Sequence, residues 1–160
     1  MRTNDAGIEI IKRYEGFRAR PYLCPAGVWT IGYGHTGGVN NRTPPVTEAE
    51  AEELLRRDLR DAEKVVTSMV TVPLNDNQFS ALVSFAFNVG AANLRTSTLR
   101  ARVNAKQFFQ AAAEFGRWVY ATDPVTGRKV QLGGLTKRRE EERGLFLRPA
   151  VAADNARFGV

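Results

Sequence analysis

Glu15 lies in an unusual place for an acid. It closes an amphipathic segment in which Ile8 and Ile11 lie seven and four residues before it. At helical spacing the three side chains share one stripe, so the pattern predicts an N-terminal helix with a carboxyl group beside buried isoleucines. Apolar surroundings disfavour the charged form of a carboxyl group. We therefore expect Glu15 to hold a proton near neutral pH and to act as a general acid.

Two further side chains with reactive groups follow at short intervals. Eight residues separate Glu15 from Cys24, the single cysteine, and five separate Cys24 from Thr30. Residues 20–35 are typical of a β-hairpin, with an extended run, a turn at 25–27 and a second strand rich in β-branched and aromatic residues. Because this hairpin follows Glu15 directly, we expect the acid, the thiol and the hydroxyl to converge.

The second strand of that hairpin has an uneven distribution of side chains. Alternation with a period of two places Val28, Thr30, Gly32 and Gly34 on one face. This face is nearly bare around one hydroxyl group. We expect it to form the floor of a cleft in which an extended substrate lies close to the backbone.

The spacing of these residues resembles the catalytic signature of phage-type lysozymes, glycoside hydrolase family 24, which includes phage endolysins. The signature is Glu, eight residues, Asp or Cys, five residues, Thr, and here it lies within 15–17 and 30–35. Residues 74–90 and 134–143 are similar to the central buried helix and the C-terminal helix of that family. The resemblance covers roughly residues 4–148. It implies an α+β, mostly helical, lysozyme-like fold with a small N-terminal hairpin lobe, a long connecting helix, a C-terminal helical lobe and a cleft between the lobes.

The resemblance also implies an activity. The expected enzyme is a lysozyme (muramidase) that hydrolyses the β-1,4 bond between N-acetylmuramic acid and N-acetylglucosamine in bacterial peptidoglycan and so causes host cell lysis. Glu15 is the expected proton donor. In relatives with aspartate at the middle position, that carboxylate and the threonine position a water molecule in an inverting reaction. Here Cys24 either acts as a partial thiolate base, helps Thr30 to orient water, attacks the sugar itself in a retaining course, or is an inert spectator.

Other residues of these segments are candidates for substrate binding. They are Gly32, Tyr33, Gly34, His35 and Asn88. His35, the single histidine, also fits a structural role as a hydrogen-bonding residue beyond the strand. Asn88 lies in an otherwise apolar helix, so we expect it to have buried partners and to hold the wall of the cleft first and to contact substrate second.

Two other functions remain open from the sequence. A lytic transglycosylase cleaves the same bond with a single catalytic glutamate and uses a hydroxyl group of the substrate as the nucleophile. A module that binds the cell wall without cleaving it would explain why cysteine replaces aspartate.

Composition limits the other possibilities. With 160 residues and 43% hydrophobic content, we expect one domain and a monomer, without a cofactor or a metal. One cysteine excludes an internal disulfide. We expect no signal peptide and no stable membrane insertion, because charged residues interrupt every apolar run. Synthesis in the host cytoplasm and action on the cell wall in the periplasm then require release, for which the resemblance implies a holin.

The net charge of +6 is not concentrated in a nucleic-acid-binding motif. We expect it to attract the protein to an anionic bacterial envelope, and we expect no nucleic-acid partner. The charged residues in 137–143 are predicted to compensate one another on the surface of a helix.

The remaining pattern predicts the organisation of the chain. A capping box at 47–50 starts a long helix over 47–66 that links lobes at roughly 14–46 and 67–148. A buried helix is expected over 75–89, and three helices near 93–103, 107–119 and 135–147 should surround it. Glycines at 127 and 133–134 predict a loop, and residues 149–160 a tail.

Overall fold

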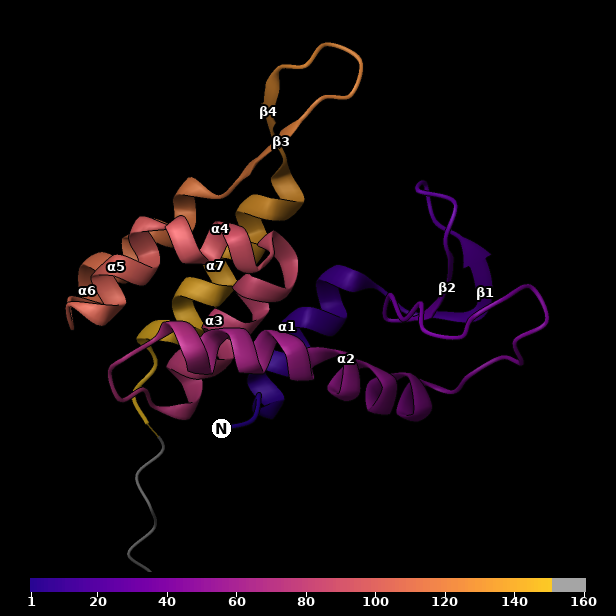
Figure 1. Ribbon diagram of the computed structural model, residues 1–160, viewed down its shortest axis with the longest axis horizontal. Helices are drawn as coiled ribbons and strands as arrows, with labels where there is room; N and C mark the ends of the chain where they lie inside the picture. The colour runs from indigo at the N-terminus through magenta and orange to yellow at the C-terminus, as the bar shows by residue number, and fades with distance from the viewer. Residues whose placement is uncertain (151–160) are drawn as a thin grey trace, which may run out of the picture.

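The computed structural model describes residues 1–150, so most of the predicted tail lies outside the described residues. The predicted class, a hairpin followed by helices, is confirmed (Figure 1). The elements in chain order are α1 (Asp5–Glu15), β1 (Arg18–Leu23), β2 (Trp29–Gly32), α2 (Glu48–Met69), α3 (Asp76–Val89), α4 (Ala91–Thr96), α5 (Thr98–Asn104), α6 (Phe108–Glu114), the short 3₁₀ helix η1 (Phe115–Arg117), β3 (Tyr120–Thr122), β4 (Lys129–Gln131) and α7 (Gly133–Leu147).

Helix α1 begins and ends where local chemistry dictates. The side chain of Asn4 accepts a hydrogen bond from the backbone N–H of Gly7 and so caps the first turn. Gly16, with φ of 74°, ends the helix after Glu15 in a conformation that other residues rarely adopt. The isoleucines of the predicted stripe, Ile8 and Ile11, are buried.

Strands β1 and β2 form the predicted antiparallel hairpin, in which Tyr22 lies opposite Thr30. The second strand is shorter than the alternation predicted, and the expectation of one continuous face through residue 34 is wrong. Gly32 has φ of 64° and turns the chain, so that Ile31 and His35 pair across a reversal. The sequence alternates beyond Gly32, but the backbone no longer does.

Helix α2 connects the hairpin region to the other helices, as Figure 1 shows. Thr47 and Glu50 form the predicted capping box, with both reciprocal hydrogen bonds present. The helix continues to Met69, three residues beyond the predicted end. Its apolar face is buried against α3 and β2, so this one helix contacts both the first hairpin and the helical part of the molecule.

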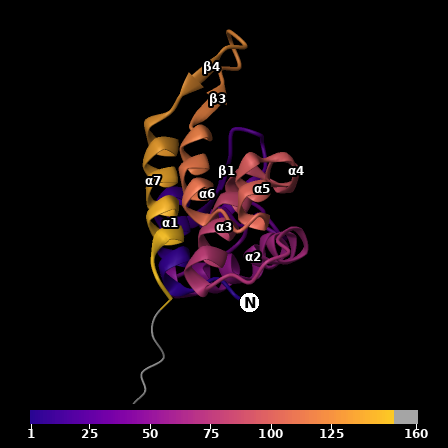
Figure 2. The same ribbon diagram turned by 90° about the vertical axis from the view of Figure 1, so that its left-hand side faces the viewer.

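The predicted central helix is α3, and it packs against α1, α2 and α7. Its apolar residues from Phe79 to Ala86 are buried, and Figure 2 shows the surrounding helices. Because α1 also packs on α7, the first and last helices of the described chain meet beside α3.

The later segments differ from the prediction in two places. The helix expected over 93–103 is divided at Ser97, whose extended backbone ends α4 and whose hydroxyl caps α5. The loop expected before α7 contains a second hairpin, β3–β4, that projects beyond α7 (Figure 2). Strands of three residues are too short to produce a period-two pattern, and Asp123 closes their turn by accepting hydrogen bonds from two backbone N–H groups.

Charged side chains join α1 and the residues before it to α2, and one of these contacts is the ion pair of Asp5 with Arg56. Lys12 contacts Glu52 at 2.9 Å, and its pKa is raised chiefly by that hydrogen bond. At the N-terminus Glu63, which is buried, accepts hydrogen bonds from the backbone and hydroxyl of Thr3 and from Arg2. Burial acts to raise the pKa of Glu63, but these hydrogen bonds outweigh it and hold the pKa below its ordinary value.

We expect Glu63→Gln to lower the free energy of unfolding by about 2 kcal/mol at pH 7, because hydrogen bonds to an ionised group are lost. Since the folded-state pKa is depressed, this contribution is complete above the unfolded pKa of about 4.3 and disappears as pH falls through the folded value. Urea unfolding at pH 7 and pH 3 measures it, and the difference from the unmodified protein should shrink at pH 3. Glu53→Gln, an exposed change on the same helix, is the control and should cost less than about 0.5 kcal/mol.

Candidate active site

Glu15 is the last residue of α1, and its side chain is 27% exposed. Its Oε1 accepts a hydrogen bond of 3.1 Å from Nη1 of Arg138 on α7. Its Oε2 lies against Gly34, where an added Cβ would be 3.6 Å away. The predicted apolar stripe is present, but the carboxylate extends past the isoleucines to a guanidinium group. Glu15 is therefore charge-paired and mostly buried, with part of its side chain exposed.

The prediction that the charged residues in 137–143 lie on the surface holds for Lys137, Glu140 and Arg143, which are exposed, but the structure corrects it for three others. Arg138, Arg139 and Glu142 are 3%, 1% and 0% exposed. They lie between α3 and α1, where α7 packs against both. For these three residues the prediction was wrong because their charges compensate one another inside the protein, where the ion pairs replace the hydration of each group.

Glu142 lies at the centre of this cluster. Its Oε1 accepts hydrogen bonds from the Ser84 hydroxyl at 2.7 Å and from Arg138 Nε at 3.2 Å. Its Oε2 lies 2.9 Å from Arg139 Nη1. Burial raises the pKa of Glu142 and lowers the pKa of Arg139, and the attraction between the opposite charges opposes both shifts.

Cys24 and Thr30 are brought together across the first hairpin. The pKa of the Cys24 thiol is lowered, chiefly by a hydrogen bond from the backbone N–H of Val28 and further by the hydroxyl of Thr30, against the effect of burial. Thr30 is buried, and its hydroxyl donates its one proton to the carbonyl of Val28 at 3.0 Å, so it donates to the thiolate only after rotating away from that carbonyl. In the described chain no hydrogen bond links this pair of residues to Glu15, so the acid and the thiol form two separate groups.

The candidate glycines and Tyr33 have different surroundings. Gly32 is buried, and an added Cβ would lie 3.0 Å from that of Ala51, so this glycine lets the hairpin approach α2. Tyr33 is 5% exposed and packs on the ring of Phe17. Gly34 is exposed beside Glu15. Of these three candidates for substrate binding, the structure leaves only Gly34 accessible, because the chain turns at Gly32.

His35 fastens the loop after the hairpin to α2. Its Nδ1 lies 2.9 Å from Asp58 Oδ2, and its Nε2 lies 2.9 Å from the carbonyl oxygen of Gly37. Both ring nitrogens therefore have partners within the protein, as expected if His35 has a structural role rather than a role in substrate binding.

Asn88 lies near the end of α3 and is itself exposed, and the expected buried partner is present in Arg139. It has one partner from the interior: its Oδ1 accepts a hydrogen bond from Arg139 Nη2. The residue is exposed because it is in the last turn of α3, where the helix leaves the core. Its amide nitrogen is left to donate to a ligand.

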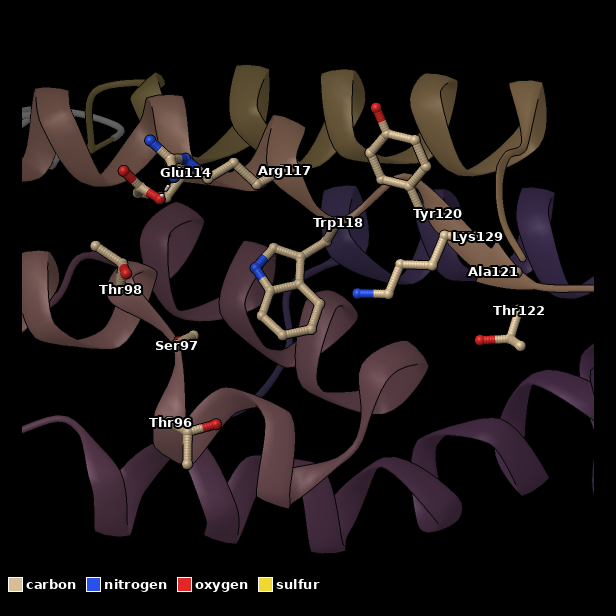
Figure 3. A pocket seen from close by; sticks show the side chains of 10 residues that line it. All are labelled: Thr96, Ser97, Thr98, Glu114, Arg117, Trp118, Tyr120, Ala121, Thr122 and Lys129. Atoms are coloured by element: carbon tan, nitrogen blue, oxygen red, sulfur yellow. Dashed lines mark ion pairs between the residues drawn. The ribbon is translucent and has the colours of Figure 1, made fainter. Parts of the chain in front are cut away.

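A cavity of about 360 Å³ lies beside this region, between the start of α5, η1 and the β3–β4 hairpin. Figure 3 shows Trp118 and Lys129 projecting into it, with hydroxyl groups on the facing wall. Glu114 lines it as an ion pair with Arg117. None of the site residues predicted from the sequence lines this cavity.

The cluster on α7 was not predicted, but the sequence contains a signal for it. Leu135, Arg138, Glu142 and Leu145 are three, four and three residues apart and so share one helical face. Two leucines at the ends of that stripe indicate that the charged residues between them are also buried. Among residues 1–150 no group of three or more His, Cys, Asp and Glu side chains is arranged to hold a metal ion.

Comparison with known proteins gives consistent matches. The family described as Phage lysozyme matches residues 12–142. The endolysin of Acyrthosiphon pisum secondary endosymbiont phage 1 is 40% identical over 146 residues, which cover 91% of this chain and 98% of that protein. The SAR-endolysin of Escherichia phage P1 is 40% identical over 155 residues, 92% of this chain and 82% of that protein.

The fold is also similar to that of a solved structure. The muramidase domain of SpmX from Asticaccaulis excentricus has a TM-score of 0.85 and 39% identity, covering 92% of this chain and 99% of that chain. The predicted fold class is confirmed by this likeness over nearly the whole length.

We expect the rate at which iodoacetamide alkylates Cys24 to rise with pH through a midpoint below the ordinary thiol value of about 8.5, because the thiolate is the reactive form. Thr30→Val should move that midpoint to higher pH, since it removes one of the groups that stabilise the thiolate. Tyr22→Phe, a loss of a hydroxyl on the paired strand, is the matched control. A midpoint at or above 8.5 in the unmodified protein would contradict this assignment.

Proposed function

This chain belongs to the phage lysozyme family, a family of glycosidases that degrade peptidoglycan, and we propose that it hydrolyses the β-1,4 bond between N-acetylmuramic acid and N-acetylglucosamine. The observation that supports this most directly is the position of Glu15. We infer that a carboxyl group that is partly exposed at the end of a helix, held by a buried guanidinium group and bordered by a glycine, is accessible to a sugar chain.

Glu15 is the proposed general acid. Cleavage of a glycosidic bond places negative charge on the departing oxygen and positive charge on the anomeric carbon, so a proton must reach that oxygen. Arg138 orients the carboxyl group before substrate binds. A bound sugar then excludes water from Glu15, which favours its protonated form.

Cys24 and Thr30 are proposed to act on the other side of the bond. A carboxylate is absent there, but the lowered pKa of Cys24 increases the fraction of thiolate at neutral pH. A thiolate stabilises a cationic sugar or accepts a proton from water, and Thr30 orients that water. In this proposal the sugar lies between the thiol and Glu15, which no hydrogen bond joins in the described residues, so that the two groups act on opposite sides of the glycosidic bond.

Substrate contacts are proposed at Gly34 and Asn88. Both are exposed, and each has one neighbour from the acid or its supporting cluster. The Asn88 amide nitrogen would donate to an acetamido or peptide carbonyl group. Gly32, Tyr33 and His35 support the hairpin in this proposal rather than contact the sugar.

The proposed place of action is the cell wall in the periplasm, after synthesis of the protein in the host cytoplasm and release that depends on a holin. In residues 1–150 no helix has both the length and the apolar composition that a membrane span requires. The net charge of +6 supports attraction to the anionic envelope. A monomer is sufficient for this function, since the acid and the thiol lie on one chain.

We expect Glu15→Gln to reduce the rate of lysis of outer-membrane-permeabilised bacteria by about 10² to 10⁴-fold, because the amide keeps the shape of the side chain but does not release a proton. Loss of turbidity measures the rate. Glu9→Gln, an exposed change on the same helix, is the control and should retain activity. If Glu15→Gln clears the suspension as fast as this control, Glu15 is not the acid.

The products distinguish the proposed hydrolysis from its alternatives. Digestion of purified peptidoglycan in ¹⁸O-water should give muropeptides with one solvent oxygen at the new reducing end. Anhydromuramic ends would instead identify a lytic transglycosylase. Binding of peptidoglycan without either product would identify a module that binds the wall without cleaving it.

Variants of Cys24 test whether its thiol takes part in the reaction. We expect Cys24→Ser to reduce kcat by at least about tenfold, because serine is not ionised at neutral pH. Cys24→Asp should keep more activity than Cys24→Ser, since it restores an anion at this position. Equal activity of the two variants and the unmodified protein in the same turbidity assay would make Cys24 a spectator.

A further inference from the structure

We propose that Glu142 is a positioning residue shared by two parts of the site: through Arg138 it orients Glu15 and balances the charge around it, and through Arg139 it orients the amide of Asn88. This inference rests on the proposed function of Glu15. It assigns a role to a carboxylate that has no exposed surface and no contact with the substrate.

The first branch runs from Glu142 to the acid. Glu142 Oε1 accepts from Arg138 Nε at 3.2 Å, and Arg138 Nη1 donates to Glu15 Oε1 at 3.1 Å. A guanidinium group is planar, so its orientation is set when Nε and one terminal nitrogen are both bound. Arg138 Nη2 also donates to the carbonyl of Ser84 at 3.2 Å, and the hydroxyl of Ser84 donates to Glu142. Glu142 and Ser84 thus fix the orientation of the Arg138 guanidinium group, and this orientation directs Nη1 to Glu15.

The second branch runs from Glu142 to Asn88. Arg139 Nη1 lies 2.9 Å from Glu142 Oε2, without the alignment of a hydrogen bond, and Arg139 Nη2 donates to Asn88 Oδ1. The guanidinium group also lies over the ring of Phe85, 5.1 Å from its centroid. Since Arg139 has only donors, it fixes which end of the Asn88 amide faces the protein and leaves the NH₂ group for a ligand.

The charges of the cluster act on Glu15 as a set. Arg138 and Arg139 are positive and Glu142 is negative, so the buried set carries one net positive charge. Ser84 on α3 is the remaining polar group that faces Glu142. The other groups at this junction are Tyr14, whose ring faces Arg138, and the ion pair of Arg13 with Glu141. Variants of Glu142 and Arg139 leave these other groups unchanged, so they do not contribute to differences between the variants.

The experiment is a charge cycle of three variants, Glu142→Gln, Arg139→Met and the double variant. Each retains a side chain of similar length. Glu142→Gln raises the buried charge by one, Arg139→Met lowers it by one, and the double variant restores it. The readout is the titration midpoint of Glu15, followed by NMR of protein with ¹³C-labelled glutamate side chains and assigned by the loss of its signal in Glu15→Gln.

We expect the Glu15 midpoint to move down by roughly half a pH unit or more in Glu142→Gln, because an extra positive charge favours the carboxylate. It should move up by a similar amount in Arg139→Met and return to within about 0.3 pH unit of the unmodified value in the double variant. The alkaline limb of the pH profile of kcat/KM should shift in the same direction as the Glu15 midpoint in each variant, because the general acid must be protonated. A midpoint that stays constant in all three variants would overturn the charge-balancing role.

The KM for peptidoglycan tests the Asn88 branch separately. Both variants that lack Arg139 should show a KM raised by at least about threefold, although the titration midpoint of Glu15 is restored in one of them. An unchanged KM in both would overturn this branch. Loss of stability alone would not produce midpoint shifts of opposite sign, and melting temperatures measured in parallel identify a variant that fails to fold.

If Glu142→Gln does not fold, comparison of Arg139→Met with the double variant still measures the effect of Glu142. Failure of this inference is distinguishable from failure of the proposed function. An active Glu15→Gln variant would contradict the proposed function itself. If Glu15→Gln is inactive but the Glu15 midpoint is the same in all three cluster variants, only the role of Glu142 is contradicted.

Discussion

A carboxylate without exposed surface, Glu142, lies between two guanidinium groups where α7 packs on α3. Burying three ionised side chains is unfavourable unless each has a partner, so the two helices must meet in one register to satisfy them. The position of α7 in turn decides where Arg138 reaches α1. The site at Glu15 therefore depends on electrostatic compensation in the interior of the helical part of the molecule.

The first hairpin, which carries Cys24 and Thr30, is positioned mainly by packing rather than by charge. Gly32 admits Ala51 of α2 at a distance that a larger residue would not allow, and Tyr33 fills the space beside Phe17. His35 adds a polar contact to Asp58 of the same helix. Because α2 also packs on α3, the hairpin and the buried charge cluster share one rigid support.

Glu15 and Cys24, the two parts of the candidate site, are held in different ways. Glu15 depends on a side chain from a helix more than a hundred residues away in the sequence, whereas the thiol of Cys24 is influenced by backbone and hydroxyl groups of its own hairpin. A distant partner holds the acid in place relative to the helical part. The groups around the thiol belong to the hairpin itself, so they do not depend on contacts with the helices. A sugar chain bound between them would contact both parts at once.

Patterns within a few residues were sufficient for α1, the first hairpin, the capping box of α2 and the buried α3, because amphipathic period, turn residues and capping act locally. They also identified Glu15, Cys24 and Thr30 as a candidate site. Local pattern was misleading where backbone conformation or distant packing intervened: the φ of Gly32 ended the alternation, and three charged side chains of α7 were buried. Only the tertiary structure decided that Arg138 contacts Glu15 and that Asn88 is exposed, since burial of a charge depends on a partner that no local spacing specifies.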